Sequence, residues 1–293
     1  WMVGPESGGM AAMFTMMNNA RLGVGVEGLG AAEAATQKAM AFAMDRKQGR
    51  TADGSDTIVG HADVRRMLMT MRTMTMAARG ICYDCAFSLD MAHADDPDGV
   101  HKARGAFLTP IAKAFSTDTG IDVAQMGVQV HGGMGFVEET GAAQFLRDVR
   151  VTAIYEGTNG IQAMDLVGRK LSDGGAAARA LLAEIADTAA AGGDMGAALA
   201  SAATALGEAT EWMLEAPDFN DRAAGCVPYL RGWGLVLGAH YLLKGAAVEG
   251  SDERTALARF FIHQILPKAH AELAAATQGA APLYALPAEK LTA

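Results

Sequence analysis

The feature that most constrains the fold is a series of long segments rich in alanine, leucine and methionine, separated by short turns of glycine, aspartate and proline. No stretch alternates apolar and polar residues over a length that could build a sheet. Segments of this kind form helices whose apolar faces pack on one another. The sequence therefore predicts an all-α protein, in which a helical bundle is followed by a second helical unit.

We expect the first unit at residues 1–171 and the second at residues 172–293, because the composition becomes rich in alanine and glycine from Ser172 onward. Ser7 is the expected N-cap of the first helix. The third helix is expected to bend near residues 118–121. The predicted helices span residues 7–44, 61–93, 100–130, 139–147, 159–171, 176–190, 195–216, 224–248 and 252–276.

Two motifs suggest a chemistry that their context excludes. The glycines of Gly23-Val-Gly-Val-Glu-Gly28 have the spacing of a dinucleotide-binding loop, but residues 16–22 before them are too polar for a buried strand. We expect these glycines to let two helices approach closely. Cys82 and Cys85 form a C-x-x-C pair that lacks the further ligands of a zinc site. We therefore predict no metal site and place both cysteines, with the methionine stripe that begins at Met67, in the core.

The charge and hydrophobicity of the chain exclude several classes of protein. The formal net charge of −9 argues against nonspecific nucleic-acid binding, which depends on Lys and Arg neutralising phosphates. Although 51% of the residues are hydrophobic, no uninterrupted apolar run reaches the roughly 18 residues typical of a membrane span. Three cysteines without disulfide spacing, and no secretory signal at the start, indicate a reducing cytoplasm.

One acidic residue, Glu156, stands out by its surroundings. It lies between the apolar run Val151-Thr-Ala-Ile-Tyr155 and a Gly-Thr-Asn-Gly turn. Apolar neighbours reduce the hydration of a carboxylate and disfavour its charged form, which makes it a better general base near neutral pH. A Glu before a Gly-Thr turn can also be a charge at a helix entry. The local pattern alone leaves both interpretations open.

Other motifs, which occur in a fixed order along the chain, support a functional interpretation of the segment around Glu156. A glycine-rich loop begins 27 residues before Glu156, and Arg21 lies 25 residues before Arg46. Together these elements resemble the acyl-CoA dehydrogenase family, and in particular a branch of larger members with a long helical tail. The matching segments are Arg21, Arg46-Lys-Gln48, Gln129-Val-His-Gly-Gly-Met-Gly-Phe136, Phe145-Leu-Arg-Asp148 and Tyr155-Glu-Gly-Thr158 with Ile161-Gln162.

The resemblance implies FAD-dependent α,β-dehydrogenation of an acyl-CoA thioester. By resemblance, Glu156 is the base that removes the α proton, and its backbone N–H donates to the thioester carbonyl. A hydride then leaves the β carbon for the flavin. The electrons are expected to pass to an electron-transfer flavoprotein.

The resemblance also assigns binding roles. Residues expected to contact substrate are Asn18, Arg21 and Gly157. Residues expected to contact FAD are Arg46 and Gln48 at the pyrophosphate, Thr158 and Asn159 after the base, and Gln129, Gly132 and Gly133 at the adenine end. Because that last loop contacts FAD held mainly by a neighbouring subunit in the family, the resemblance implies a homo-oligomer.

Several alternatives stay open at this level. We expect the chain to be the C-terminal part of a longer protein, because Trp1 and the residues after it read as the end of an earlier element. A catalytically inert helical oligomerisation module is therefore the second hypothesis, and the acidic tail disfavours a third, a DNA-binding flavoprotein. The length of the acyl chain, a methylthio group on it, and the choice between dehydrogenase and oxidase are not determined.

Overall fold

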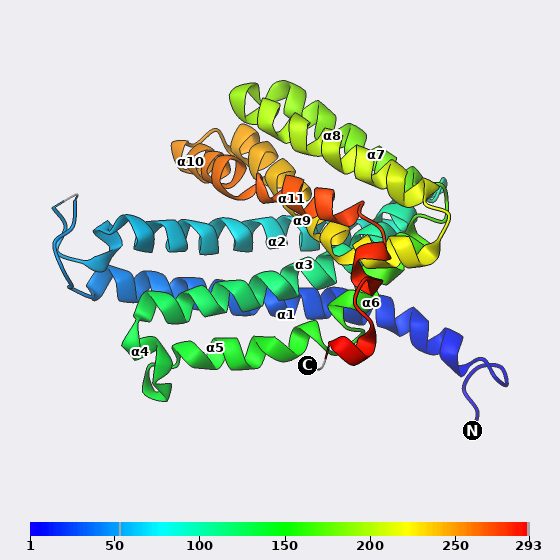
Figure 1. Cartoon of the computed structure of the whole chain (residues 1–293), viewed down its shortest axis with the longest axis horizontal. Coiled ribbons are helices and arrows are strands. Elements are labelled where there is room, and N and C mark those ends of the chain that lie inside the picture. The colour runs from blue at the N-terminus through cyan, green and yellow to red at the C-terminus, as the bar shows by residue number, and fades with distance from the viewer. Residues whose placement is uncertain (53, 292–293) are drawn as a thin grey trace.

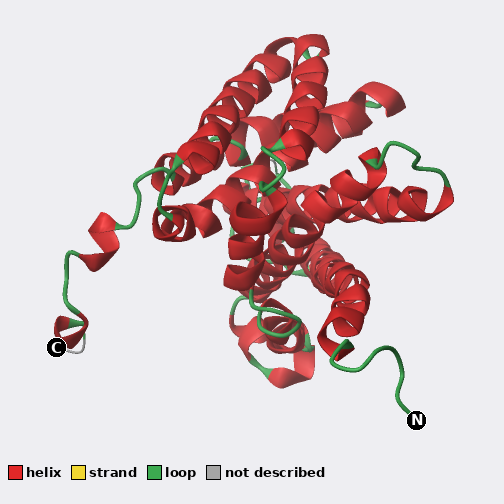
Figure 2. Cartoon of the chain, turned by 90° about the vertical axis from the view of Figure 1, so that its right-hand side faces the viewer, coloured by secondary structure: helices red, strands yellow, loops and turns green. Residues whose placement is uncertain are grey.

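The computed structural model describes residues 1–52 and 54–291, without the side chains of Thr15 and Asn18. Over this range it consists of helices and connecting loops, with no strand (Figure 2), which confirms the predicted all-α class. Long helices lie side by side in the first bundle (Figure 1). They are α1 (Gly9–Asp45), α2 (Ala62–Ala94), α3 (Val100–His131) and the shorter α5 (Ala142–Val149).

Short elements connect these helices and shape their ends. The turn that holds Glu156 follows the 3-10 turn η3 (Arg150–Ala153) and precedes α6 (Asn159–Asp165). Helix α6 lies toward the N-terminal half of α1, whereas α4 (Gly133–Phe136) lies near its C-terminal end (Figure 1). The two groups of predicted site residues are therefore at different ends of the bundle.

The second helical unit packs on the first through its longest helix, α9, which contacts both α2 and α3. Its helices are α7 (Ala176–Ala191), α8 (Gly193–Glu215), α9 (Phe219–Glu249), α10 (Asp252–Phe260) and α11 (Lys268–Ala276). One cluster of buried apolar side chains runs from the first bundle into this unit, and the rings of Phe107 and Trp233 meet edge to face at 5.0 Å within it. The division of the chain after Leu171 stays a prediction.

Two details of the helix predictions were wrong, the Ser7 cap and the unbroken last helix. Ser7 does not cap α1, because its φ is +63° and the cap position is held by Gly8, which has no side chain to offer. Helix α3 is one continuous helix through residues 118–121, and a bend there stays a prediction. The predicted helix 252–276 is divided, because a π-helical turn at Phe261–Ile265 and the ring of Pro267 separate α10 from α11.

Helices α1 and α3 approach each other closely at two glycines of the segment 23–28, which has the glycine spacing of a dinucleotide-binding loop. A Cβ on Gly25 would lie 2.8 Å from the carbonyl oxygen of Ala112, and one on Gly28 would lie 2.7 Å from the Cα of Thr117. From the other side, a Cβ on Gly120 would lie 2.6 Å from the carbonyl oxygen of Gly28. The predicted close approach is confirmed, and residues 23–28 lie inside α1 rather than in a phosphate-binding loop.

The remaining core predictions also hold. Met67, Met71, Cys82 and Cys85 are buried, and the cysteines are free thiols. Burial raises the pKa of the Cys82 thiol to about 11 and that of Cys85 to about 12. Thiols with such pKa values are protonated at neutral pH and are poor nucleophiles or metal ligands. The pair therefore serves packing.

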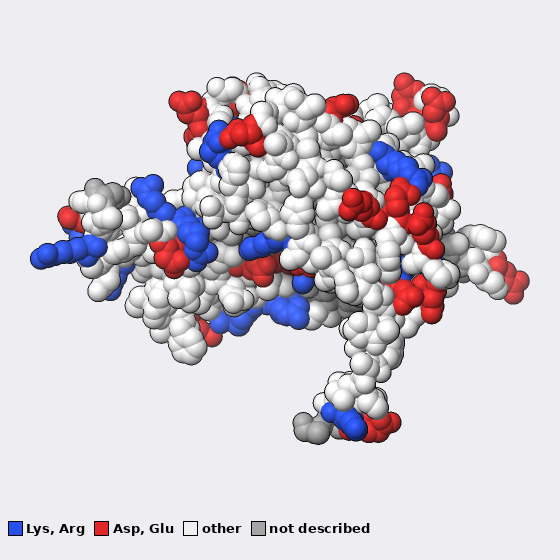
Figure 3. Space-filling view, turned by 45° about the horizontal axis from the view of Figure 1, so that its top comes forward, with Lys and Arg blue, Asp and Glu red and all other residues white. Residues whose placement is uncertain are grey.

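The surface carries mixed charge. On the face in Figure 3, Lys and Arg side chains are interspersed with Asp and Glu side chains rather than gathered in one basic patch. Within the described residues, none of the helices is long and apolar enough to cross a lipid bilayer.

Replacing Gly28 by alanine is expected to lower the free energy of unfolding by about 1–3 kcal/mol, because the added methyl group meets backbone atoms that cannot move aside. Gly23→Ala is the matched control, since nothing lies within 4 Å of the added methyl group. Removing a helical glycine there should stabilise the protein by up to about 1 kcal/mol. Urea unfolding followed by circular dichroism measures both, and equal effects would contradict the close contact.

Candidate active site

The backbone around Glu156 adopts a conformation that few residues with side chains take. Glu156 has φ +56° and Gly157 has φ +85°, so two consecutive residues lie in the left-handed region. Among the described residues other than glycine, Ser7 near the start is the other example. Strained backbone of this kind is concentrated at functional sites, where the surrounding structure holds it in place. The turn is thus a candidate site on geometric grounds alone.

The side chain of Glu156 is available for chemistry. Its Oε2 atom is buried and has no hydrogen-bond partner within the described part of the chain. The Glu156 backbone N–H also donates to no acceptor among the described residues. A buried carboxylate oxygen without a partner can accept a proton, and a free N–H beside it can bind an oxygen that gains negative charge. One turn therefore offers both a base and an anion-stabilising donor.

Residues at the start of α6 fix the Glu156 turn through hydrogen bonds. Thr158 is the N-cap, and its Oγ1 accepts from the backbone N–H of Ile161 at 3.3 Å, while its side chain stays exposed. Gln162 is fully buried, and its Nε2 donates to the carbonyl oxygens of Glu156 at 3.2 Å and Gly157 at 3.4 Å. The φ of Gly157, +85°, favours glycine here, and a Cβ would also lie 2.8 Å from that Nε2 atom.

Asn159 joins the turn to α3. Its Nδ2 donates to Asp118 Oδ1 at 2.7 Å and to Thr117 Oγ1 at 2.9 Å, and its Oδ1 accepts from Lys113 Nζ at 2.9 Å. Lys113 Nζ also donates to the carbonyl oxygen of Gly157 at 2.9 Å. The Asn159 side chain is therefore engaged with α3, and the flavin contact predicted for this residue stays a prediction.

Arg21 lies in the same region but pairs with a different acid. Its Nη1 is 3.1 Å from Asp165 Oδ2, and both side chains are buried, with 5% and 2% of their surface exposed. Asp165 Oδ1 also accepts from Arg169 Nε at 2.5 Å. The Arg21 Nε–H is buried without a partner among the described residues. The side chain of Asn18, one turn earlier on α1, lies outside the described part of the structure.

Tyr155, before the base, is fixed on α1. Its hydroxyl donates to Glu27 Oε2. Burial, this hydrogen bond, and the negative charges of Glu27 and Glu156 raise the pKa of Tyr155 to about 12. The phenol therefore stays protonated at neutral pH and keeps its hydrogen bond, which ties the turn to a second helix.

The other predicted residues meet at the far end of the bundle. Arg46 and Gln48 follow the end of α1, and Gln129 and Gly132 end α3; all four are exposed. The two helix ends are joined by the stacked rings of Phe42 and His131, 4.3 Å apart. Nothing lies within 4 Å of a Cβ built on Gly132 or Gly133, so their backbone is open to a ligand. At roughly 1.5 Å per helical residue, Arg46 is about 37 Å from Arg21.

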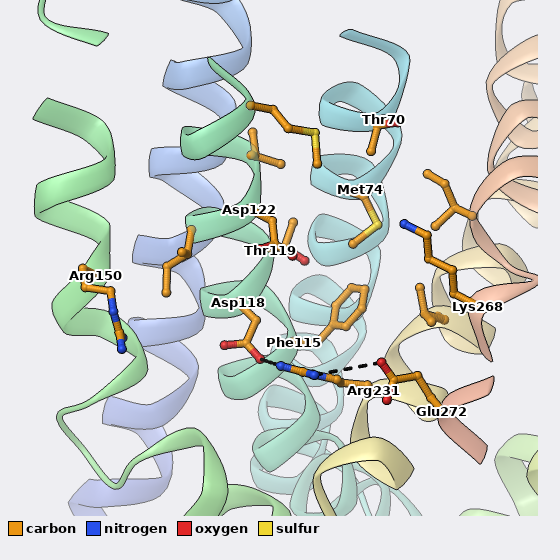
Figure 4. A pocket seen from close by; sticks show the side chains of 15 residues that line it. Thr70, Met74, Phe115, Asp118, Thr119, Asp122, Arg150, Arg231, Lys268 and Glu272 are labelled. Atoms are coloured by element: carbon orange, nitrogen blue, oxygen red, sulfur yellow. Dashed lines mark ion pairs between the residues drawn. The ribbon is translucent and has the colours of Figure 1, made fainter. Parts of the chain in front are cut away.

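A separate cleft of about 590 Å³ lies between α3 and the second unit (Figure 4). Arg231 of α9 lies 3.7 Å from Asp118 and 4.0 Å from Glu272 along its wall. No residue predicted to bind substrate or flavin lines it. It touches the candidate site only through Asp118, whose other oxygen accepts from Asn159.

Lys113, Asp165 and Gln162 contact the site although no such role was predicted for them from the sequence. Lys113 carried a signal, because it is a cation in the middle of the apolar segment Ile111-Ala-Lys-Ala-Phe115 of a helix that is buried nearly all round. Buried cations need partners and often mark function. Asp165 carried none, since it is separated from Arg21 by 144 residues.

Family models match most of the chain. Residues 7–171 match "Acyl-CoA dehydrogenase, C-terminal domain", and residues 181–287 match "Acetyl-CoA dehydrogenase C-terminal like". The chain belongs to the acyl-CoA dehydrogenase family. This confirms the resemblance drawn from the ordered motifs. The second match indicates that the later helices are also related to known acyl-CoA dehydrogenase tails.

Individual relatives agree with the family. This acyl-CoA dehydrogenase chain is 41% identical over 299 residues to 3-methylmercaptopropionyl-CoA dehydrogenase of Ruegeria pomeroyi, with 93% of this chain and 51% of that protein covered. It thus spans about half of that relative's length. Two solved structures share its fold. Caenorhabditis elegans ACDH-11 in complex with C11-CoA has a TM-score of 0.75 and 18% identity, covering 87% of this chain and 44% of that one. A Bacillus anthracis acyl-CoA dehydrogenase complexed with FAD has a TM-score of 0.70 and 19% identity, covering 90% and 49%.

Replacing Asp165 by asparagine is expected to lower the free energy of unfolding by about 3 kcal/mol, because the buried guanidinium of Arg21 loses its counter-charge. Glu211→Gln is the control, since its ion pair with Arg179 is about half exposed. Exposed pairs contribute at most about 1 kcal/mol. Chemical denaturation measures both variants, and equal losses would contradict a special role for the buried pair.

Proposed function

We propose that this chain supplies the catalytic base of an FAD-dependent dehydrogenase acting on an acyl-CoA thioester, with Glu156 as the proton acceptor. The observation that carries the proposal is the Glu156 carboxylate, whose Oε2 is buried and unpaired on a backbone held at positive φ. Neither the strain nor the missing hydrogen bond favours folding, so both point to a use in catalysis.

The chemistry fits what the turn offers. A C–H bond next to a thioester carbonyl is a weak acid, so its cleavage needs a positioned base and a donor for the enolate-like oxygen. Glu156 provides the base through its side chain and the donor through its backbone N–H. The free Nε–H of Arg21 provides a cation for the substrate near the same turn.

The far end of the bundle fits the phosphates and adenine of the cofactor. Arg46 offers a guanidinium for phosphate oxygens, Gln48 and Gln129 offer amides, and the open backbone of Gly132 and Gly133 allows close approach. When bound, FAD supplies the acceptor for the hydride that leaves the β carbon. The exposed Thr158 hydroxyl could contact it at the catalytic end. The separation of about 37 Å along α1 favours one cofactor end being served by a neighbouring subunit, and hence a homo-oligomer.

The relatives support a finer proposal for the substrate. The 41% identity to 3-methylmercaptopropionyl-CoA dehydrogenase supports 3-methylmercaptopropionyl-CoA as the acyl thioester. An electron-transfer flavoprotein as electron acceptor and a cytoplasmic location are proposed from the family resemblance and the cysteine usage. The alternative, an inert helical oligomerisation module, predicts a complete protein that binds no FAD and leaves acyl-CoA unchanged.

In the complete protein, Glu156→Gln is expected to retain bound FAD but to slow flavin bleaching by acyl-CoA by about 100- to 10,000-fold, because the proton acceptor alone is removed. Glu139→Gln, a change at an exposed acid outside the turn, is the control and should bleach normally. Stopped-flow absorbance with 3-methylmercaptopropionyl-CoA and butyryl-CoA measures both. Near-normal bleaching by Glu156→Gln would refute the role of Glu156.

Replacing Arg46 by alanine is expected to weaken FAD retention by about 10- to 100-fold, because a charged hydrogen bond to phosphate contributes roughly 1.5–3 kcal/mol. The neighbouring Lys47 is the matched control, since it is an exposed cation already paired with Asp56 at 3.3 Å. Equilibrium dialysis of FAD against the complete protein measures both. Equal losses from Arg46→Ala and Lys47→Ala would mean that only net charge matters.

A further inference from the structure

Lys113 is a buried cation whose presence the fold itself does not explain. It lies in the middle of α3 with none of its surface exposed, between the buried residues Ile111 and Phe115. Burying an ammonium group is unfavourable, and replacing it with an apolar residue of similar size would cost a protein core little or nothing. Its presence at this position therefore calls for a local role.

The partners of Lys113 all belong to the segment that carries Glu156. Its Nζ donates to the carbonyl oxygen of Gly157 and to Asn159 Oδ1, each at 2.9 Å. Among the described residues, Lys113 forms no ion pair within 4 Å. Its ammonium group is therefore bound by these two neutral oxygens. A charged donor makes hydrogen bonds about twice as strong as a neutral one.

These bonds act on the strained part of the turn. Gly157 directly follows Glu156, and both have positive φ. The other donor to the Gly157 carbonyl is Gln162 Nε2, at the longer distance of 3.4 Å. Asn159 continues the attachment, because its Nδ2 donates to Asp118 and Thr117 of the same helix. Without Lys113, the Gly157 carbonyl would keep only the longer hydrogen bond from Gln162 among the described residues.

We propose that Lys113 is a positioning residue for Glu156: its ammonium group holds the Gly157 carbonyl and the Asn159 amide against α3, and so fixes the direction of the carboxylate. This inference rests on the proposed function, because it takes Glu156 as the base. It adds a residue that acts through the turn and does not touch the substrate itself.

The charge of Lys113 gives the role a pH dependence. Burial is the main cause that lowers the pKa of Lys113 to about 8; Arg21 on α1 adds to the effect, while Asp118 on α3 and Glu156 on the turn oppose it. Lys113 is therefore charged at pH 7 and loses its charge as the pH rises through about 8. Its hydrogen bonds to the turn weaken over that window, and the rate of proton abstraction should fall.

The test uses two variants of the complete protein. Lys113→Met removes donor and charge while keeping the length of the side chain, and Lys113→Gln keeps an N–H donor without the charge. Lys170→Met is the matched control, because Lys170 is half-buried and burial lowers its pKa, as it does that of Lys113. Lys170 makes no hydrogen bond to residues 156–162 in the described structure. Stopped-flow bleaching of bound flavin by acyl-CoA gives the rate, and hydrogen exchange of the peptide spanning residues 154–162 reports the order of the turn.

We expect Lys113→Met to slow bleaching by about 10- to 100-fold with KM changed less than about threefold, since a misdirected base loses rate rather than affinity. Exchange in the 154–162 peptide should rise while α2 and α3 stay protected. Lys113→Gln should fall between wild type and Lys113→Met and should lack the decline in rate above pH 8. Lys170→Met should match wild type in bleaching rate, in the pH dependence of that rate and in hydrogen exchange.

The outcomes separate this inference from the function it rests on. Wild-type protein that is not bleached by any acyl-CoA, or an unaffected Glu156→Gln variant, would overturn the proposed function. A Lys113→Met variant with wild-type rate and wild-type exchange, beside an inactive Glu156→Gln variant, would overturn the role of Lys113 alone. Exchange that rises throughout α3 would also overturn it, because Lys113 would then serve the stability of the helix.

Discussion

The arrangement of the site depends on one packing contact, the close approach of α1 and α3. Gly25 and Gly28 let the two backbones come together where any side chain would clash. This contact places Arg21 of α1 and Lys113 of α3 near the turn that carries Glu156. It also brings the C-terminal ends of both helices into contact through the stacked rings of Phe42 and His131. A wider spacing, such as larger residues would impose, would disturb both ends of the bundle at once.

The buried cations around the Glu156 turn bind groups other than the Glu156 carboxylate. Asp165 satisfies one edge of Arg21, and the Gly157 carbonyl and Asn159 satisfy Lys113. Neither cation forms an ion pair with Glu156 in the described structure. A direct ion pair would stabilise the carboxylate and weaken it as a base, whereas cations held by other groups leave its Oε2 atom free.

The second helical unit is part of the same packed body rather than a loosely attached addition. Helix α9 fills the face of α2 and α3, with Trp233 against Phe107. Arg104 of α3 binds Asp84 of α2 and Glu184 of α7, which adds a half-buried polar link between the units. The packing of α3 from one side by α1 and from the other by α9 gives the rigid support that a strained catalytic turn requires.

The sequence by itself determined the helical class, most helix positions and the family, because helical periodicity, turn residues and ordered motifs are local properties of the chain. It also predicted the two groups of site residues around Glu156 and Arg46. It could not show that Arg21 meets Asp165, or that Lys113 meets Gly157 across 44 residues. The sequence also did not predict that the last long helix is divided at Phe261–Ile265 or that Ser7 does not cap α1. Partners of buried charges, and the strained φ of Glu156, were decided only by the tertiary structure, because they depend on which helices pack together and how closely.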